Sequence, residues 1–401
     1  MNFNLNKYIA RPFSHKEVSV TRKLLKRGLD DAWKINGMFE EKFSQYMNCQ
    51  HTLACSNGTA AMEEALWACG IKEGDEVVAP AMTYWASVFP AFILGAKIQY
   101  ADIDPNTLCI DPYDIEKKIT KKTKAIIVVH LYGHPCDMDR IISLAHKYGL
   151  KVIEDFSHAH GALYKGKKCG TIGDVGIASC MGEKAFYLPE GGVLCTNSDD
   201  IFEKACLFGH YRYIGMVENS RLEPGIVSRM DWNNLIGAPL GAVKDRMNPV
   251  SALIGIERLK HFERDMEEMR KAMLLFIKRL EESGYYYGHI IKEQDSSMGG
   301  WYSPVIFSKK NAQKVAGIVR SKGYNCQSGH RYFDLSTHPM NFKDFIRENI
   351  IDVTDDLVLK VQHSGIEDGA DKIITIPRFT RFNKRVINKY ADLYIKAAQE
   401  V

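Results

Sequence analysis

The 401-residue sequence lacks features that mark several classes of protein. None of its ten cysteines forms a Cys-x-x-Cys pair, which argues against a zinc site and a disulfide framework and favours buried free thiols in a reducing compartment. No window reaches about eighteen uninterrupted apolar residues, and the N-terminal segment has no apolar stretch behind a basic end. The sequence therefore predicts neither export nor membrane insertion, and the cytoplasm is the expected location.

The charge of the chain gives no indication of a nucleic-acid partner. The 53 basic and 49 acidic residues leave a net charge of +4, and the lysines and arginines are dispersed, apart from small groups such as 117–118 and 121–122. We interpret those groups as solvated surface. A chain of this length, with 45% hydrophobic and 25% charged residues, can form one large α/β domain and a smaller one.

Between about residue 52 and residue 245, short β-branched runs alternate with helical stretches. This alternation predicts a mostly parallel sheet covered by helices. Helices are expected at 59–69 and at 138–150, where Gly149 ends the run. The seven predicted strands occupy residues 52–56, 76–80, 97–103, 125–130, 151–156, 176–180 and 192–196.

The pattern changes beyond Asn248, where a long amphipathic helix is followed by alternating strand-like and helical pieces. We therefore predict a large α/β domain at 31–248 and a smaller C-terminal α+β domain at 249–401, with the long helix as a bridge. Residues 1–30 are too short to fold alone. We expect this N-terminal segment to pack on the small domain or on a partner subunit.

Gly58 and Thr59 lie in a Ser-Asn-Gly-Thr stretch between a predicted strand and an Ala-rich helix. Their backbone amides would stand at a helix N-terminus, where the helix dipole and unpaired N–H groups favour a phosphate. The stretch taken alone is more typical of a simple helix cap.

Asp155 follows an apolar run and is expected at the carboxyl end of a strand, where ligands of open α/β sheets bind. A buried carboxylate there is costly unless a cation pairs with it. The protonated ring nitrogen of pyridoxal phosphate is such a cation. Position alone leaves a capping aspartate as an equal interpretation.

Ser179 ends the next strand, and Lys184 falls in the loop before a Gly191-Gly192 pair. The flanks of Lys184 are Gly, Ala, Phe and Tyr, so its amine is expected to be partly desolvated, which lowers the pKa toward that of a nucleophile. Pyridoxal phosphate needs an amine for its aldehyde, a carboxylate for its ring nitrogen and donors for its phosphate. Lys184, Asp155 and Ser179 together indicate a site for it.

Two further residue types suit a flat aromatic cofactor. Tyr84 and the adjacent Trp85 offer a face for ring stacking, with core packing as the competing explanation. His158 could donate or accept at the phenolic oxygen of the ring, although a lone histidine is more often structural.

The order of these pieces resembles the DegT/DnrJ/EryC1/StrS family of sugar aminotransferases. The resemblance extends from about Phe39 to residue 259, with a weaker tail to the C-terminus, and several motifs in a fixed order are more specific than any one of them. The stretches that carry it are SNGTAAMEEAL, GDEVVAPAMTYWAS, VVHLYGHPCDMD, VIEDFSHAHGA, GDVGIASC, EKAFYLPEGG and RMNPVSALIGIERL.

The resemblance implies an aspartate aminotransferase-like fold (fold type I of the pyridoxal phosphate-dependent transferases) and a homodimer with shared active sites. It assigns Lys184 to the Schiff base, Asp155 to the pyridine nitrogen, His158 to the phenolic oxygen and Tyr84 to ring stacking. The phosphate is assigned to Gly58, Thr59 and Ser179.

The chain departs from the family where an Asn often reaches the phosphate of the neighbouring subunit. Lys244 stands there, and its charge could serve the same purpose. The segment 209–241 is longer than the common pattern and is expected to shape the substrate pocket. Four charged residues could meet an anionic substrate and are as easily structural: Arg212, Arg221, Arg246 and His330.

The resemblance implies transfer of an amino group from glutamate or glutamine to a keto sugar, nucleotide-linked or phosphorylated, or to a keto cyclitol. Related 3-dehydratases carry His where the aminotransferases carry Lys, so Lys184 favours transamination over dehydration. A slight similarity of 244–249 to a Lys-containing branch points toward inosose-type substrates. A pyridoxal phosphate-dependent dehydratase or lyase, and a regulatory protein that only binds the cofactor, stay open as alternatives.

Overall fold

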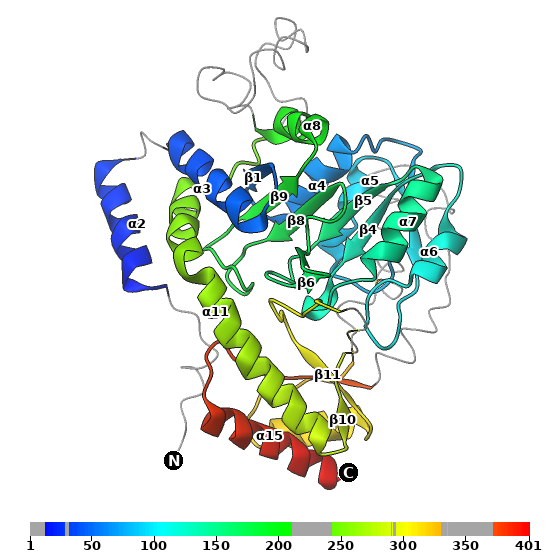
Figure 1. The fold of residues 1–401 in the computed structure, drawn as a ribbon, viewed down its shortest axis with the longest axis vertical. Coiled ribbons are helices and arrows are strands. Elements are labelled where there is room, and N and C mark those ends of the chain that lie inside the picture. Colours follow the sequence, from blue (N-terminus) through cyan, green and yellow to red (C-terminus); the bar gives the residue numbers. More distant parts are fainter. Residues whose placement is uncertain are drawn as a thin grey trace, which may run out of the picture.

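A large sheet and a small sheet, connected by a long helix, organise the chain (Figure 1). The structure is a computed structural model that describes residues 13–28, 32–210, 243–289, 291, 294–329, 335 and 372–401. The large sheet has seven strands in the order β1-β9-β8-β5-β4-β2-β3. Their bounds are His51–Cys55 (β1), Glu76–Pro80 (β2), Lys97–Ala101 (β3), Thr123–Val129 (β4), Lys151–Asp155 (β5), Val175–Ser179 (β8) and Gly192–Thr196 (β9).

Six of the seven strands run in one direction, because only β9 pairs antiparallel with its neighbours β1 and β8. This mostly parallel sheet confirms the predicted fold class. The strands are apolar on both faces, as in β4, where Ile126 and Ile127 belong to two separate buried clusters. A parallel sheet must be covered on both faces, and helices supply the cover.

Helices of the large domain pack on both faces of this sheet. α3 (Ala32–Met47), α7 (Met138–Tyr148) and the start of α11 belong to one buried cluster, and α4 (Gly58–Ala68) and α8 (Asp199–Gly209) to the other. Gly149 caps α7 with φ of 66°, a left-handed conformation that costs glycine little. The shorter elements are η1 (Trp85–Ser87), α5 (Pro90–Ile93), α6 (Pro112–Lys118), η2 (Leu131–Gly133), β6 (Leu163–Tyr164) and β7 (Lys167–Lys168).

α11 (Pro249–Glu282) runs from α3 beside the large sheet to the small sheet and α15 (Figure 1). It begins at Pro249 with Asn248 as its N-cap, since proline at a first helical position needs no hydrogen-bond partner. The small antiparallel sheet comprises β10 (Tyr286–Tyr287), β11 (Val305–Ser308) and β12 (Ile373–Thr375), and α12 (Ala312–Ser321) and α15 (Lys384–Gln399) pack nearby. The domain boundary predicted near residue 248 coincides with this N-cap, and the division itself stays a prediction.

α2 (His15–Arg27) packs on α11, where a buried ion pair joins Glu17 to Arg258 at 2.7 Å. This contact lies on the helix that begins the predicted small domain; any contact of residues 1–30 with a partner subunit stays a prediction. All ten cysteines are free thiols, and eight of them are buried. Among the described residues, no helix has the length and apolar character needed to cross a membrane.

Candidate active site

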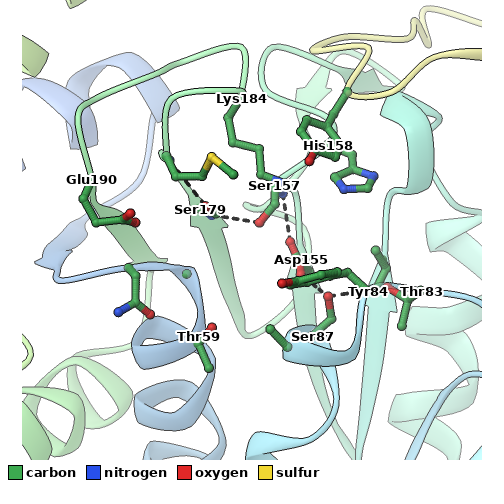
Figure 2. Close-up of a pocket in the computed structure, with 16 residues that line it drawn as sticks. Thr59, Thr83, Tyr84, Ser87, Asp155, Ser157, His158, Ser179, Lys184 and Glu190 are labelled. Atoms are coloured by element: carbon green, nitrogen blue, oxygen red, sulfur yellow. Dashed lines mark hydrogen bonds between the residues drawn. The ribbon is translucent and has the colours of Figure 1, made fainter. Parts of the chain in front are cut away.

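A cavity of about 240 Å³ lies at the carboxyl ends of the parallel strands β1, β2, β4, β5 and β8 (Figure 2). Ligands of open α/β sheets bind at this edge. Seven of the eight residues predicted for the site line it: Gly58, Thr59, Tyr84, Asp155, His158, Ser179 and Lys184. The remaining lining residues are Asn57, Thr83, Ala86, Ser87, Val129, Ser157, Met181, Glu190 and Tyr302.

The N-terminus of α4 forms one wall of this cavity. The Asn57 side chain caps the helix by accepting a hydrogen bond from the backbone N–H of Ala60 at 2.9 Å. A Cβ at Gly58 would lie 2.8 Å from the Ser179 Cβ and 2.9 Å from its backbone nitrogen, and one at Gly192 would lie 2.2 Å from the Asn57 carbonyl oxygen. Glycine at both positions therefore lets the turn after β1 pack directly on β8 and β9, beside the helix N-terminus.

Asp155 is 5% exposed at the end of β5. Its carboxylate accepts hydrogen bonds from the Ser87 hydroxyl at 2.6 Å and from the Ser157 backbone N–H at 2.8 Å (Figure 2). The Ser157 hydroxyl in turn accepts from the Ser179 backbone N–H at 2.8 Å. These bonds fix the carboxylate orientation and tie the ends of β5 and β8 together.

His158 is buried, and its pKa lies well below the ordinary value because burial and then the Lys184 charge disfavour the imidazolium. The neutral ring accepts a hydrogen bond at Nδ1 from the Tyr132 backbone N–H at 3.3 Å. The proton must then reside on Nε2, which makes that atom the donor of the ring.

Lys184 is 7% exposed in the loop after β8 and extends toward the centre of the cavity (Figure 2). Burial lowers its pKa from the ordinary 10.5 to about 8, against the opposing attraction of the Asp155 carboxylate. At pH 7, about one amine in ten is then uncharged, compared with about one in three thousand for an ordinary lysine. The Nζ atom lies 3.7 Å from the centre of the Tyr302 ring.

Tyr84 stands at the wall of the cavity with 40% of its surface exposed, and its ring centre is 5.1 Å from that of Trp85. Partial exposure leaves a ring face open to a ligand, which a fully packed core residue would lack. Lys244 is exposed on the segment that pairs with the end of β1 and does not line this cavity. Its predicted reach into a neighbouring subunit stays a prediction.

Several residues of the site carry no sequence signal of their own. Ser87 and Ser157 orient Asp155, and Tyr302 comes from a segment far from the other lining residues in the sequence. Ser157 could have been found only indirectly, from its place two residues after a predicted site aspartate. Of the residues considered for an anionic substrate, Arg246 is exposed, whereas Arg212, Arg221, His330 and nearly all of the segment 209–241 lie outside the described residues.

A second group of polar side chains is buried where the end of β1, helix α4 and the end of α8 meet. Each of three residues offers one atom of a type that can bind a metal ion, and these atoms lie within 4.8 Å of one another: Cys55, Glu64 and His210. The thiol donates to one Glu64 carboxylate oxygen at 3.3 Å, and the imidazole lies 2.9 Å from the other. These hydrogen bonds account for the burial of the carboxylate without a metal ion.

Comparisons with known proteins agree with this fold. The family model described as "DegT/DnrJ/EryC1/StrS aminotransferase family" matches residues 14–363. The chain is 39% identical over 242 residues to the GDP-perosamine synthase of Escherichia coli O157:H7, covering 60% of this chain and 62% of that protein. It is 34% identical over 249 residues to the L-glutamine:2-deoxy-scyllo-inosose aminotransferase of Streptomyces lividus, covering 62% of this chain and 57% of that one.

Among solved structures, the aminotransferase from Psychrobacter cryohalolentis superimposes with a TM-score of 0.79 at 24% identity, covering 97% of each chain. The mostly parallel seven-stranded sheet and this superposition identify the pyridoxal phosphate-dependent transferase fold. The chain belongs to the DegT/DnrJ/EryC1/StrS aminotransferase family, whose members depend on pyridoxal phosphate. The matched part spans less than two thirds of the curated relatives named above.

Proposed function

We propose that this chain is a pyridoxal phosphate-dependent aminotransferase that moves an amino group from glutamate or glutamine to a keto sugar or keto cyclitol. The observation that carries the proposal is the Lys184 amine, which is buried in the cavity that Asp155 also lines and has a pKa lowered to about 8. An amine with a strongly perturbed pKa in such a cavity is typical of a covalent catalyst.

The cavity residues fit the cofactor on three counts. The lowered pKa of Lys184 suits attack on an aldehyde. The buried Asp155 carboxylate has hydrogen-bond donors, and the described residues give it no direct ion pair beyond the longer-range attraction to Lys184, so it can pair with a protonated ring nitrogen. Gly58 and Thr59 open α4, where the helix dipole favours the dianionic phosphate.

When bound, pyridoxal phosphate supplies an aldehyde that reacts with amines and a protonated ring that withdraws electrons. Lys184 would hold the aldehyde and, once the donor's amine displaces it, carry the proton from the donor's α-carbon. Asp155 would keep the ring nitrogen protonated, and the Nε2–H of His158 would donate to the phenolic oxygen. Tyr84 would cover the ring face.

The phosphate would be held by Gly58, Thr59 and Ser179 of one chain. The cation lining the described cavity is Lys184, which lies at the aldehyde end in this proposal. A dianion therefore benefits from a further positive charge, and Lys244 of a second copy of the chain is the proposed source. This assignment makes a homodimer with shared sites part of the proposed function.

The names of the relatives support the substrate class. One is named for a nucleotide-linked amino sugar, and the other for an inosose that receives its amine from glutamine. Transamination forms an amine from a keto group, so we propose a keto sugar, nucleotide-linked or phosphorylated, or a keto cyclitol as the acceptor. Nucleic acid and membranes have no part in this function, which we assign to the cytoplasm.

The test is a single-turnover reaction with glutamate, and separately with glutamine, in the absence of any acceptor. A transaminase should release close to one keto acid per cofactor and then stop until an acceptor is added. Lys184→Ala, which keeps the surrounding cavity, should release none and serves as the control. No keto acid released from either donor, although the cofactor is bound, would contradict the proposal and favour a lyase, a dehydratase or a cofactor-binding regulator.

A panel of acceptors then separates the substrate classes. Each candidate is added to the enzyme already charged with the donor's amine, and the return of the original cofactor spectrum is followed. Nucleotide-linked keto sugars, phosphorylated keto sugars and keto cyclitols form the three arms. We expect one of the three acceptor classes to restore the original cofactor spectrum at micromolar to millimolar concentration, a typical range of KM.

A further inference from the structure

Two residues beyond α11 contact the loop that carries Lys184. One guanidinium nitrogen of Arg378 (Nη2) donates a hydrogen bond to the Glu183 backbone carbonyl oxygen at 2.6 Å. The Tyr302 hydroxyl donates to the Glu183 side-chain Oε2 at 3.2 Å, and the Tyr302 ring lies against the Lys184 ammonium at 3.7 Å. Residues distant in the sequence thus hold both the main chain and the side chain of the residue before Lys184.

Arg378 occupies an electrostatically costly position. Its other terminal nitrogen, Nη1, is inaccessible to solvent, and no described residue accepts a hydrogen bond from it. Burial lowers the pKa of Arg378 to about 10, against the opposing effects of Tyr302 and Glu183. A partly buried cation near the buried Lys184 ammonium costs stability, and the hydrogen bond to the Glu183 carbonyl oxygen offsets part of that cost.

The charges around Lys184 come from several elements. Asp155 at the end of β5 and Glu183 in its own loop favour the ammonium, whereas the Arg378 charge disfavours it. The Cys180 thiol also favours the ammonium of Lys184. His158 is buried near Lys184 and is neutral because its pKa is lowered. Among the residues that the structure describes, Arg378 is the cation whose charge offsets the attraction of Asp155.

We propose that Arg378 and Tyr302 are positioning residues for Lys184, which fix the Glu183–Lys184 backbone from the C-terminal part of the chain and hold the amine in the cavity. The inference rests on the proposed role of Lys184 in binding the cofactor. The added claim is that Lys184 reaches its reactive position only when the segments around residues 302 and 378 pack on the loop after β8.

The test measures the amine directly in the full-length chain without cofactor. Trace acetylation with acetic anhydride at a series of pH values, followed by mass spectrometry, gives the pKa and reactivity of Lys184, with the exposed Lys122 as an internal reference. The second readout is the rate at which added pyridoxal phosphate attaches at pH 7, trapped with borohydride. The variants are Arg378→Gln, Arg378→Lys and Tyr302→Phe, and Arg381→Gln is a matched control because Arg381 is exposed on the same segment.

Arg378→Gln removes the positive charge that disfavours the Lys184 ammonium. Because charges near a protein surface interact through an effective dielectric constant of about 20, the loss should raise the pKa of Lys184 by about one unit. Attachment at pH 7 should then slow about tenfold, because ten times less amine is uncharged. Arg378→Lys restores a charge and should recover most of the lowered pKa. Tyr302→Phe loses one hydrogen bond and should slow attachment by about two- to tenfold.

The outcomes separate the two proposals. If the wild-type chain does not attach the cofactor at Lys184, the proposed function fails, and the positioning role loses its basis. If the wild type attaches it and Arg378→Gln matches Arg381→Gln within twofold in both readouts, the positioning role is overturned while the function stands. Should Arg378→Gln fail to fold, Tyr302→Phe decides: slowed attachment supports the role, and the wild-type rate overturns it.

Discussion

Replacing Lys184 with methionine should stabilise the chain when no cofactor is bound. Methionine keeps the length and volume of the side-chain stem but carries no charge. Burial lowers the pKa of Lys184 from 10.5 to about 8, so the folded state holds this proton less tightly than the unfolded state does. The cost of that buried ammonium should disappear in the variant.

The magnitude follows from the two pKa values. A difference of about 2.5 pH units, at about 1.4 kcal/mol per unit, makes the ammonium cost about 3 kcal/mol below pH 8. Between about pH 8 and 10.5 the unfolded state binds the proton and the folded state does not, so the stability of the wild type rises with pH. The advantage of Lys184→Met should therefore fall from about 3 kcal/mol at pH 7 to less than about 1 kcal/mol at pH 10.

The assay is urea unfolding of both cofactor-free proteins at pH 7 and pH 10, at one chain concentration because an oligomer would make stability concentration-dependent. The exposed Lys122→Met is the matched control and should change the free energy of unfolding by no more than about 0.5 kcal/mol at either pH. A wild type more stable than Lys184→Met at pH 7, or an advantage that does not change with pH, would refute the reasoning from burial. Such a result would place the amine in a solvated or fully paired environment.

Three further substitutions test other parts of the site and of the sheet that carries it. Gly58→Ala brings a Cβ within 2.8 Å of the Ser179 side chain in β8, and overpacking of this kind costs about 1–3 kcal/mol. Fluorescence titration should therefore show cofactor affinity weakened by about five- to 150-fold. Gly317→Ala is the control and should bind the cofactor normally, because its Cβ would meet only the end of an arginine side chain at 3.9 Å. Asp155→Asn should keep the cofactor but slow keto acid release from glutamate by about 100-fold or more, and near-normal rates would remove Asp155 from its role. Glu154→Gln places an amide NH2 against the Gly170 backbone N–H and the His130 ring and removes the buried charge, so it should lower the free energy of unfolding by about 3 kcal/mol, a value that chemical denaturation can check.

The strands and most of the cavity could be predicted because their signals are local. Each of the seven strands is a short apolar run between turns, and the structure places them within two residues of the predicted bounds. The carboxyl ends of parallel strands meet at one edge, so Asp155 and Ser179 had to lie close together once the sheet formed. Lys184 lies in the loop directly after the strand that ends at Ser179, so it reaches the same cavity.

The contacts of Tyr302 and Arg378 could not be predicted in this way. The segment before Tyr302 depends on backbone angles that no pattern gives, with φ of 65° at Gly300 and 40° at Trp301. Non-local contacts of this kind depend on how the C-terminal part docks, and no spacing in the sequence encodes that. The tautomer of His158 is likewise set by a backbone N–H distant in the sequence, from Tyr132.

The central claim is that Lys184 is the residue that holds pyridoxal phosphate. The most direct test is to incubate the full-length chain with the cofactor, reduce it with borohydride, digest it and locate the added mass by tandem mass spectrometry. The account predicts one pyridoxyl group per chain, on Lys184, and its loss in Lys184→Ala. A label on a different lysine, or no label although the cofactor is bound, would contradict the account.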